Sequence, residues 1–83
     1  MEFSFFDEAY KRAKQVSEDF LREKGLHSKF YEIEGKVDSN EVPQNIKWAN
    51  LLNSTVDEVS NSLNIEPNEV FDELSVRYFN TKI

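Results

Sequence analysis

Apolar residues at spacings of three and four begin near the start of the chain. The positions concerned are Phe6, Tyr10, Ala13, Ser17 and Phe20. Side chains three and four residues apart lie on one face of an α-helix, so this spacing predicts a helix over residues 5–24. Gly25 follows the last of these turns. Because glycine readily adopts the left-handed conformation that ends many helices, we expect the helix to end there.

The periodicity changes after this glycine. Tyr31, Ile33, Gly35 and Val37 alternate with Glu32, Glu34 and Lys36. A two-residue alternation is typical of a half-buried strand, which predicts a strand over residues 29–37. A single strand leaves backbone groups without partners, so it needs a second one. We favour pairing with residues 78–83. The alternatives are pairing with the same strand in a homodimer, an extended segment lying over the helices, and an exposed edge that accepts a strand from another protein.

Three further helices are predicted in the second half of the chain. Pro43 suits a first helical turn, and the apolar residues after it predict a short buried helix over residues 43–53. Thr55 and Glu58 have the spacing of a capping box, which predicts a new helix over residues 55–63. Pro67 opens the last one, over residues 67–79, and its inward positions are expected to be Val70, Phe71, Leu74 and Tyr78. The expected fold is a single mainly α domain over residues 1–83, or an α+β domain if the strand is counted.

The segment from Thr55 to Val70 resembles a generic helix-turn-helix, with a small residue within its first helix and Asn64 at the turn. The resemblance implies that the second helix would read DNA through Asn68, Glu69, Asp72, Glu73 and Ser75. DNA binding depends on Lys and Arg contacts to phosphate, and no Lys or Arg occurs between Trp48 and Val76. We therefore do not expect direct binding to nucleic acid.

The negative charge of the chain is distributed unevenly. The net charge is −6, yet residues 1–29 contain six acidic and six basic residues, so the excess lies in the later segments. Such a surface attracts basic partners and repels nucleic acid and anionic membranes, or it serves solubility alone. The candidate partner-binding acids are Asp57, Glu58, Glu66, Glu69, Asp72 and Glu73.

Aromatic residues supply the second set of candidates. Most of them lie on the predicted inward faces, and Trp48 is expected to anchor its helix in the core. Phe5, Phe30 and Phe79 do not fit those faces. If exposed among carboxylates, these three residues would form the apolar centre of a protein-binding patch. The alternative is that they close the core from other sides.

Residues for catalysis are scarce in this sequence. There is no cysteine, one histidine (His27) and two glycines, which excludes a cysteine nucleophile and a glycine-rich phosphate loop. No calcium-binding loop is present either. We expect no catalytic residues, no metal and no cofactor. The absence of a long apolar run and of cysteine predicts a cytoplasmic protein without a signal peptide or membrane anchor.

These observations together predict a non-enzymatic protein–protein interaction module. We expect a small acidic regulator or inhibitor that docks on a basic surface of a target protein, such as a nucleic-acid-binding site. In size and charge the chain resembles phage-encoded anti-restriction and anti-CRISPR inhibitors. Two alternatives remain. One is a helix-turn-helix transcriptional regulator that uses the basic residues between Lys11 and Lys29, and the other is an oligomerising structural or assembly protein.

Overall fold

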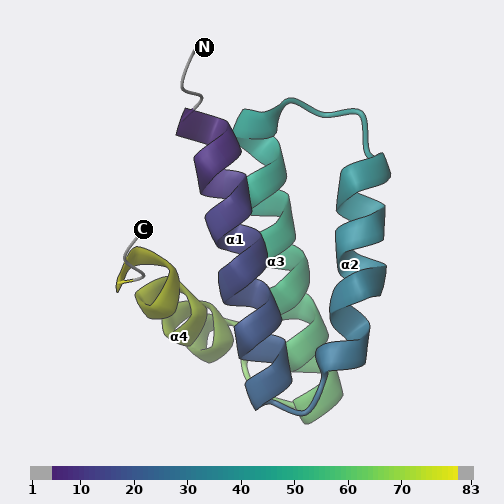
Figure 1. Ribbon diagram of the computed structural model, residues 1–83. Coiled ribbons are helices and arrows are strands. Elements are labelled where there is room, and N and C mark those ends of the chain that lie inside the picture. Colours follow the sequence, from purple (N-terminus) through teal and green to yellow (C-terminus); the bar gives the residue numbers. More distant parts are fainter. Residues whose placement is uncertain (1–4, 81–83) are drawn as a thin grey trace.

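The fold is a small helical bundle, seen in a computed structural model that describes residues 5–80 (Figure 1). Side chains are described throughout this range except at residues 5, 6 and 44. The four helices of the described chain are α1 (Phe5–Glu23), α2 (His27–Ser39), α3 (Gln44–Leu63) and α4 (Pro67–Asn80). The prediction of a mainly α fold with about four helices is confirmed.

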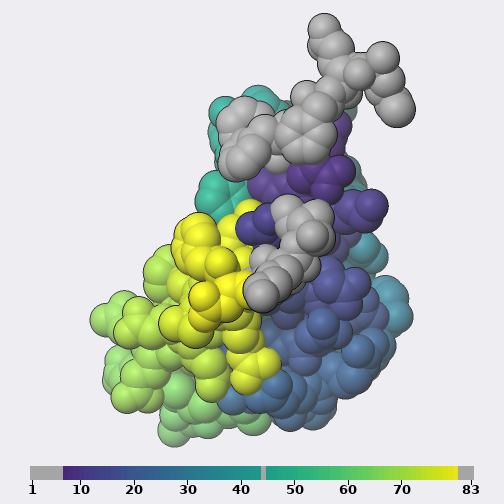
Figure 2. Space-filling view, turned by 60° about the vertical axis from the view of Figure 1, so that its left-hand side comes forward, coloured from purple at the N-terminus to yellow at the C-terminus, as the bar shows by residue number. Residues whose placement is uncertain are grey.

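Helices α1 and α3 form the centre of the bundle and run in the same direction (Figure 1). Helix α2 contacts both of them on one side, and α4 contacts both on the other. Within residues 5–80, α2 and α4 do not contact each other. Figure 2 shows α4, in yellow, lying against α1. The beginning of α3, in teal, lies close to the C-terminal end of α4. This arrangement leaves one side of the α3–α4 pair open to solvent.

Helix α1 follows its predicted pattern closely. Tyr10, Ala13 and Phe20 are buried, and the helix ends one residue earlier than predicted. Gly25 has a φ of 77°, and the next amide, that of Leu26, donates a hydrogen bond of 2.8 Å to the carbonyl of Leu21. These features are typical of an α-helix that ends with a residue in the left-handed conformation, which turns the chain back toward the core.

The predicted strand over residues 29–37 is wrong, because these residues belong to helix α2. Phe30, Ile33 and Val37 are its buried residues, at spacings of three and four, whereas Tyr31 is 59% exposed. Ile33 and Val37 fit both periodicities, so the alternation was ambiguous. A helix satisfies its own backbone groups without a second strand. The homodimer based on strand pairing loses its basis, and residues 81–83 of the proposed pairing segment lie outside the described residues.

The two helices predicted over residues 43–53 and 55–63 are one continuous helix, α3. Thr55 was expected to cap the second of them, but its side chain is buried and its hydroxyl donates a 2.9 Å hydrogen bond to the carbonyl of Leu51. A threonine can satisfy its hydroxyl in this way without interrupting a helix. Glu58, the expected capping partner, instead accepts a hydrogen bond of 2.5 Å from Ser62.

A short turn joins α3 to α4 and fixes their relative position. Asn64 adopts the left-handed conformation, with φ 55° and ψ 49°. The Ser60 hydroxyl donates a 2.7 Å hydrogen bond to the carbonyl of Ile65, which ties the turn to the last turns of α3. Pro67 then begins α4, as predicted. The buried residues of α4 are Val70, Leu74 and Tyr78.

The hydrophobic core runs between α1 and α3 and is closed by α2 and α4. Its fully buried large side chains are Phe20, Leu21, Leu51, Val59 and Leu74. Two ion pairs join α4 to the end of α1: Arg77 contacts Glu23 with both terminal nitrogens, and Lys24 contacts Glu73 at 2.8 Å. None of the described helices is long and apolar enough to cross a membrane.

Candidate functional site

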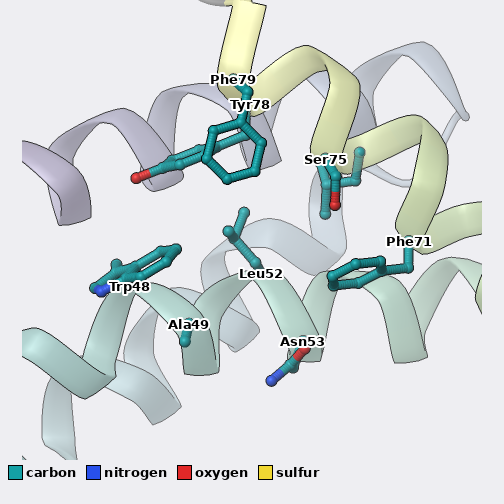
Figure 3. Close-up of a pocket in the computed structure, with 9 residues that line it drawn as sticks. Trp48, Ala49, Leu52, Asn53, Phe71, Ser75, Tyr78 and Phe79 are labelled. Atoms are coloured by element: carbon teal, nitrogen blue, oxygen red, sulfur yellow. The ribbon is translucent and has the colours of Figure 1, made fainter.

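An apolar groove lies between α3 and α4 on the open side of the bundle (Figure 3). It has a volume of about 260 Å³. One wall comes from the first half of α3 and the other from α4, so the tight turn at Asn64 brings the two walls together. The lining residues are Trp48, Ala49, Leu52, Asn53, Phe71, Leu74, Ser75, Tyr78 and Phe79. Within this lining, Asn53, Ser75, Trp48 and Tyr78 carry the polar side-chain atoms.

Stacked aromatic rings close one end of the groove. The rings of Trp48 and Tyr78 lie 5.6 Å apart between centroids, with an interplanar angle of 12°. The Tyr78 hydroxyl donates a hydrogen bond of 3.4 Å to the carbonyl of Ala9, and the guanidinium of Arg12 lies 5.5 Å from the ring centroid. Burial raises the pKa of Tyr78, which favours the protonated hydroxyl that donates this hydrogen bond. This end of the groove is held in place by α1.

Two phenylalanines form the exposed part of the α4 wall. Phe71 is 48% exposed and Phe79 is 73% exposed, and they lie two turns apart on α4 with Ser75 between them. The Phe79 ring makes an edge contact with Tyr78, at 5.2 Å between centroids. Large aromatic side chains left in contact with water beside an apolar groove are typical of a surface that another molecule covers.

Acidic residues border both walls. Asp72 is seven residues from Phe79 on α4, which places the two about 20° apart around the helix axis. Asp57 follows Asn53 by one turn on the same side of α3. Both aspartates are exposed. Two of the described cations point elsewhere: Lys47 donates to the carbonyl of Asp38 at the end of α2, and Arg77 lies on the α1 side of α4. Arg12 contacts the lining from the α1 side, at the Tyr78 ring.

The six predicted acids do not form a single face. Asp57 and Asp72 border the groove, whereas Glu69 and Glu73 share the other edge of α4, where Glu73 is paired with Lys24. Glu66 precedes α4 in the turn. Glu58 lies about 180° around α3 from Ala49, away from the groove. Sequence spacing alone could not separate these groups, because it does not show which side of each helix faces its neighbours.

The predicted aromatic candidates have three different outcomes. Phe79 is exposed at the groove, as the interaction hypothesis requires. Phe30 is 3% exposed and packs in the core, which removes it from the candidate surface. Phe5 begins α1, and its side chain lies outside the described residues.

Phe71 was expected in the core and is instead half exposed on the groove. Sequence reasoning assigned Trp48 and Leu52 to a buried helix. Both are partly buried against the core, and they also line the groove. A signal was present: Phe71, Ser75 and Phe79 follow a four-residue spacing beside the buried residues of α4. A helix with a second apolar stripe next to its core stripe has more apolar surface than its own core requires.

Other chemistry-bearing residues serve the fold. His27 begins α2, and its Nε2 lies 2.9 Å from Glu18 and 3.2 Å from a terminal nitrogen of Arg22. These contacts join the start of α2 to α1. Among the described residues, no three His, Cys, Asp or Glu side chains lie close enough together to hold a metal ion.

Comparison with known proteins gives no relative from which a function could be carried over. No family model, no curated protein and no solved structure matches the chain.

Proposed function

We propose that this protein is a non-enzymatic interaction module that binds a basic surface of another protein through the groove between α3 and α4. The observation that supports this most directly is the exposure of Phe71 and Phe79 beside an apolar groove. Helical spacing places Asp57 and Asp72 next to its lining residues Asn53 and Phe79. An apolar centre with a polar rim is the usual anatomy of a protein interface. Aromatic residues at such a centre often supply much of the binding free energy.

The proposed action is that of a small acidic regulator or inhibitor. From Trp48 to Val76 the chain has six acidic residues and no Lys or Arg, and two of these acids, Asp57 and Asp72, lie next to the groove lining by helical position. A basic target region would be attracted to it and held by apolar contacts. Where that region normally binds nucleic acid, occupation by this protein would block it.

DNA binding by the N-terminal third is supported less well. Lys14, Arg22 and Lys24 each contact a carboxylate of the same chain, which lowers the positive charge that they could offer to phosphate. The α3–α4 pair does have the tight turn of a helix-turn-helix, but the residues around its groove are acidic. A protein partner therefore fits the surface better.

The proposal can be tested by affinity capture from the native lysate at low and high salt, with and without nuclease. The bait proteins are the wild type, Asp72→Lys at the groove and Glu41→Lys in the exposed segment between α2 and α3. The two substitutions change the net charge equally. We expect a protein that both the wild type and Glu41→Lys recover, that Asp72→Lys recovers poorly, and that high salt releases.

Two results would contradict the proposal. Equal recovery by all three baits would show that the groove edge does not contribute to binding. Loss of the captured material after nuclease treatment would show that nucleic acid carries the interaction, which would instead favour the DNA-binding alternative.

A further inference from the structure

The length of the groove matches two turns of an α-helix. Phe71 and Phe79 are eight residues apart on α4, which corresponds to about 12 Å at the helical rise of 1.5 Å per residue. Leu52 lies between the two ends, and Trp48 and Phe71 lie at opposite ends (Figure 3). A helix laid along the groove could place apolar side chains at spacings of three, four and seven against these residues.

The backbone of the groove does not suit an extended segment. Both walls are helices, so their backbone amides and carbonyls are already used within α3 and α4. A strand added here would bury its own amides against apolar side chains, with few acceptors other than Asn53 and Ser75. A helix satisfies its backbone internally and presents only side chains to the groove. The geometry therefore favours a helical occupant.

The charges at the groove edges limit the composition of that occupant. Asp57 lies on the α3 side and Asp72 on the α4 side, so a docked helix would pass between two carboxylates. Among the described residues nearby, Arg12 is the cation that contacts the groove lining, and it does so from the α1 side of Tyr78. Lys or Arg on both flanks of the occupant's apolar stripe would complement this arrangement, whereas Glu or Asp would be repelled.

We propose that the groove binds a basic amphipathic helix of the partner protein. The apolar stripe of that helix packs between Phe71 and Phe79 and over Leu52, and its basic flanks face Asp57 and Asp72. This inference rests on the proposed function and gives the form of the partner segment. Two neighbouring helices that receive a third one between them are a recurrent mode of peptide recognition.

The chain contains its own reporter for a test. Trp48 is the single tryptophan of the sequence and lines the groove in a stack with Tyr78. Tryptophan fluorescence can therefore follow a titration with a synthetic helical peptide of about 15 residues, made of Leu at helical spacings and Lys on the flanks. Two peptide controls are required. One replaces every Lys with Glu, and the other keeps the composition but scrambles the order, which removes the apolar stripe.

Two groove variants and two matched controls complete the experiment. Phe79→Ala is compared with Tyr31→Ala at an aromatic position on α2 that is 59% exposed, against 73% for Phe79. Asp72→Lys is compared with Glu41→Lys. We expect saturable binding of the Leu/Lys peptide to the wild type. Phe79→Ala and Asp72→Lys should each raise the Kd by roughly 10-fold, while the two controls stay near the wild-type value. Circular dichroism of each variant verifies that α-helix content is retained.

Several outcomes would overturn the inference. These are no saturable fluorescence change, equal affinity for the scrambled or Glu peptide, and equal affinity of groove and control variants. A concentration-dependent dimer in sedimentation that Phe79→Ala abolishes would show instead that a second copy occupies the groove. If the peptide does not bind while capture from lysate still depends on Asp72, the inference that the partner segment is a helix is wrong, and the proposed function stands.

Discussion

A contact between Tyr10 and Asp38 shows how single residues join the helices of this bundle. The Tyr10 hydroxyl donates to the Asp38 carboxylate, and Lys14 lies near both, 4.7 Å from the tyrosine ring centroid and 3.5 Å from the carboxylate. Tyr10 is buried in α1, while Asp38 lies near the end of α2. The contact therefore fixes the end of α2 that is farthest from the α1–α2 turn.

This contact predicts a pH-dependent loss of stability at alkaline pH. Burial, and then the hydrogen bond to Asp38, raise the pKa of Tyr10 above its ordinary value of about 10. The stabilising contribution is fully present below the unfolded-state pKa and is lost as the pH rises from there through the folded-state pKa. At pH 7, Tyr10→Phe should lower the free energy of unfolding by about 1 kcal/mol.

The measurement is urea unfolding of the wild type and Tyr10→Phe from pH 7 to pH 11. The stability difference between them should shrink above about pH 10, because phenylalanine has no proton to lose. A difference that stays constant up to pH 11 would show that the environment of Tyr10 does not favour its neutral form.

Two glycines affect the stability of whole helices in opposite ways. Gly25 ends α1 with a φ of 77°, whereas Gly35 lies within α2 with open space where a Cβ would be. The residue that precedes helix α2, Leu26, makes no side-chain hydrogen bond that caps the helix. The stability of α2 must therefore come largely from packing against α1 and α3.

Gly35→Ala should stabilise the protein by about 0.5–1 kcal/mol, since alanine restricts the unfolded chain and favours helix. Gly25→Ala is the contrasting variant and should destabilise by about 1 kcal/mol, because a Cβ disfavours positive φ. Chemical unfolding of both variants at neutral pH measures the two effects. A loss of stability in Gly35→Ala would be inconsistent with an exposed helical position.

The sequence was most informative where the apolar residues fitted only one periodicity and where a glycine or proline marked the end or start of a helix. Helix α1 with Gly25, and α4 with Pro67, were located to within one residue. The strand predicted over residues 29–37 was wrong because Ile33 and Val37 fit both the strand spacing and the helix spacing. The expected break before Thr55 failed because its hydroxyl can bond to Leu51 within a helix as well as cap a new one.

The candidate site was predictable only in part, for a related reason. Residue type identified an acidic, aromatic-rich second half. For Phe79 it left both exposure and closure of the core open, and the residue is 73% exposed. The groove itself depends on the relative position of α3 and α4, which side-chain spacing does not specify. Phe71 could therefore not be distinguished from the buried Leu74 by sequence alone.

At the scale of the whole molecule, folding and the proposed binding depend on different residues. Leu74 is 1% exposed, and Leu74→Ala should lower the free energy of unfolding by about 2–5 kcal/mol through the cavity it leaves. Phe79 is mostly exposed, and Phe79→Ala should change stability by no more than about 0.5 kcal/mol. Equilibrium unfolding in urea compares the two. A large loss in Phe79→Ala would assign that ring to the core rather than to an interface.

The walls of the groove come from α3 and α4 alone, yet their positions depend on α1. Tyr78 is anchored to Ala9, and two ion pairs hold α4 against the end of α1. A peptide containing only the two wall helices would expose Val59 and Leu74, which are buried in the intact bundle. The groove thus exists only in the folded chain, and its occupation is thermodynamically coupled to folding. An occupant present at a free concentration of 100 times its Kd would add about 2.7 kcal/mol to the free energy of unfolding. Binding of a target would therefore also protect this small protein from unfolding and proteolysis.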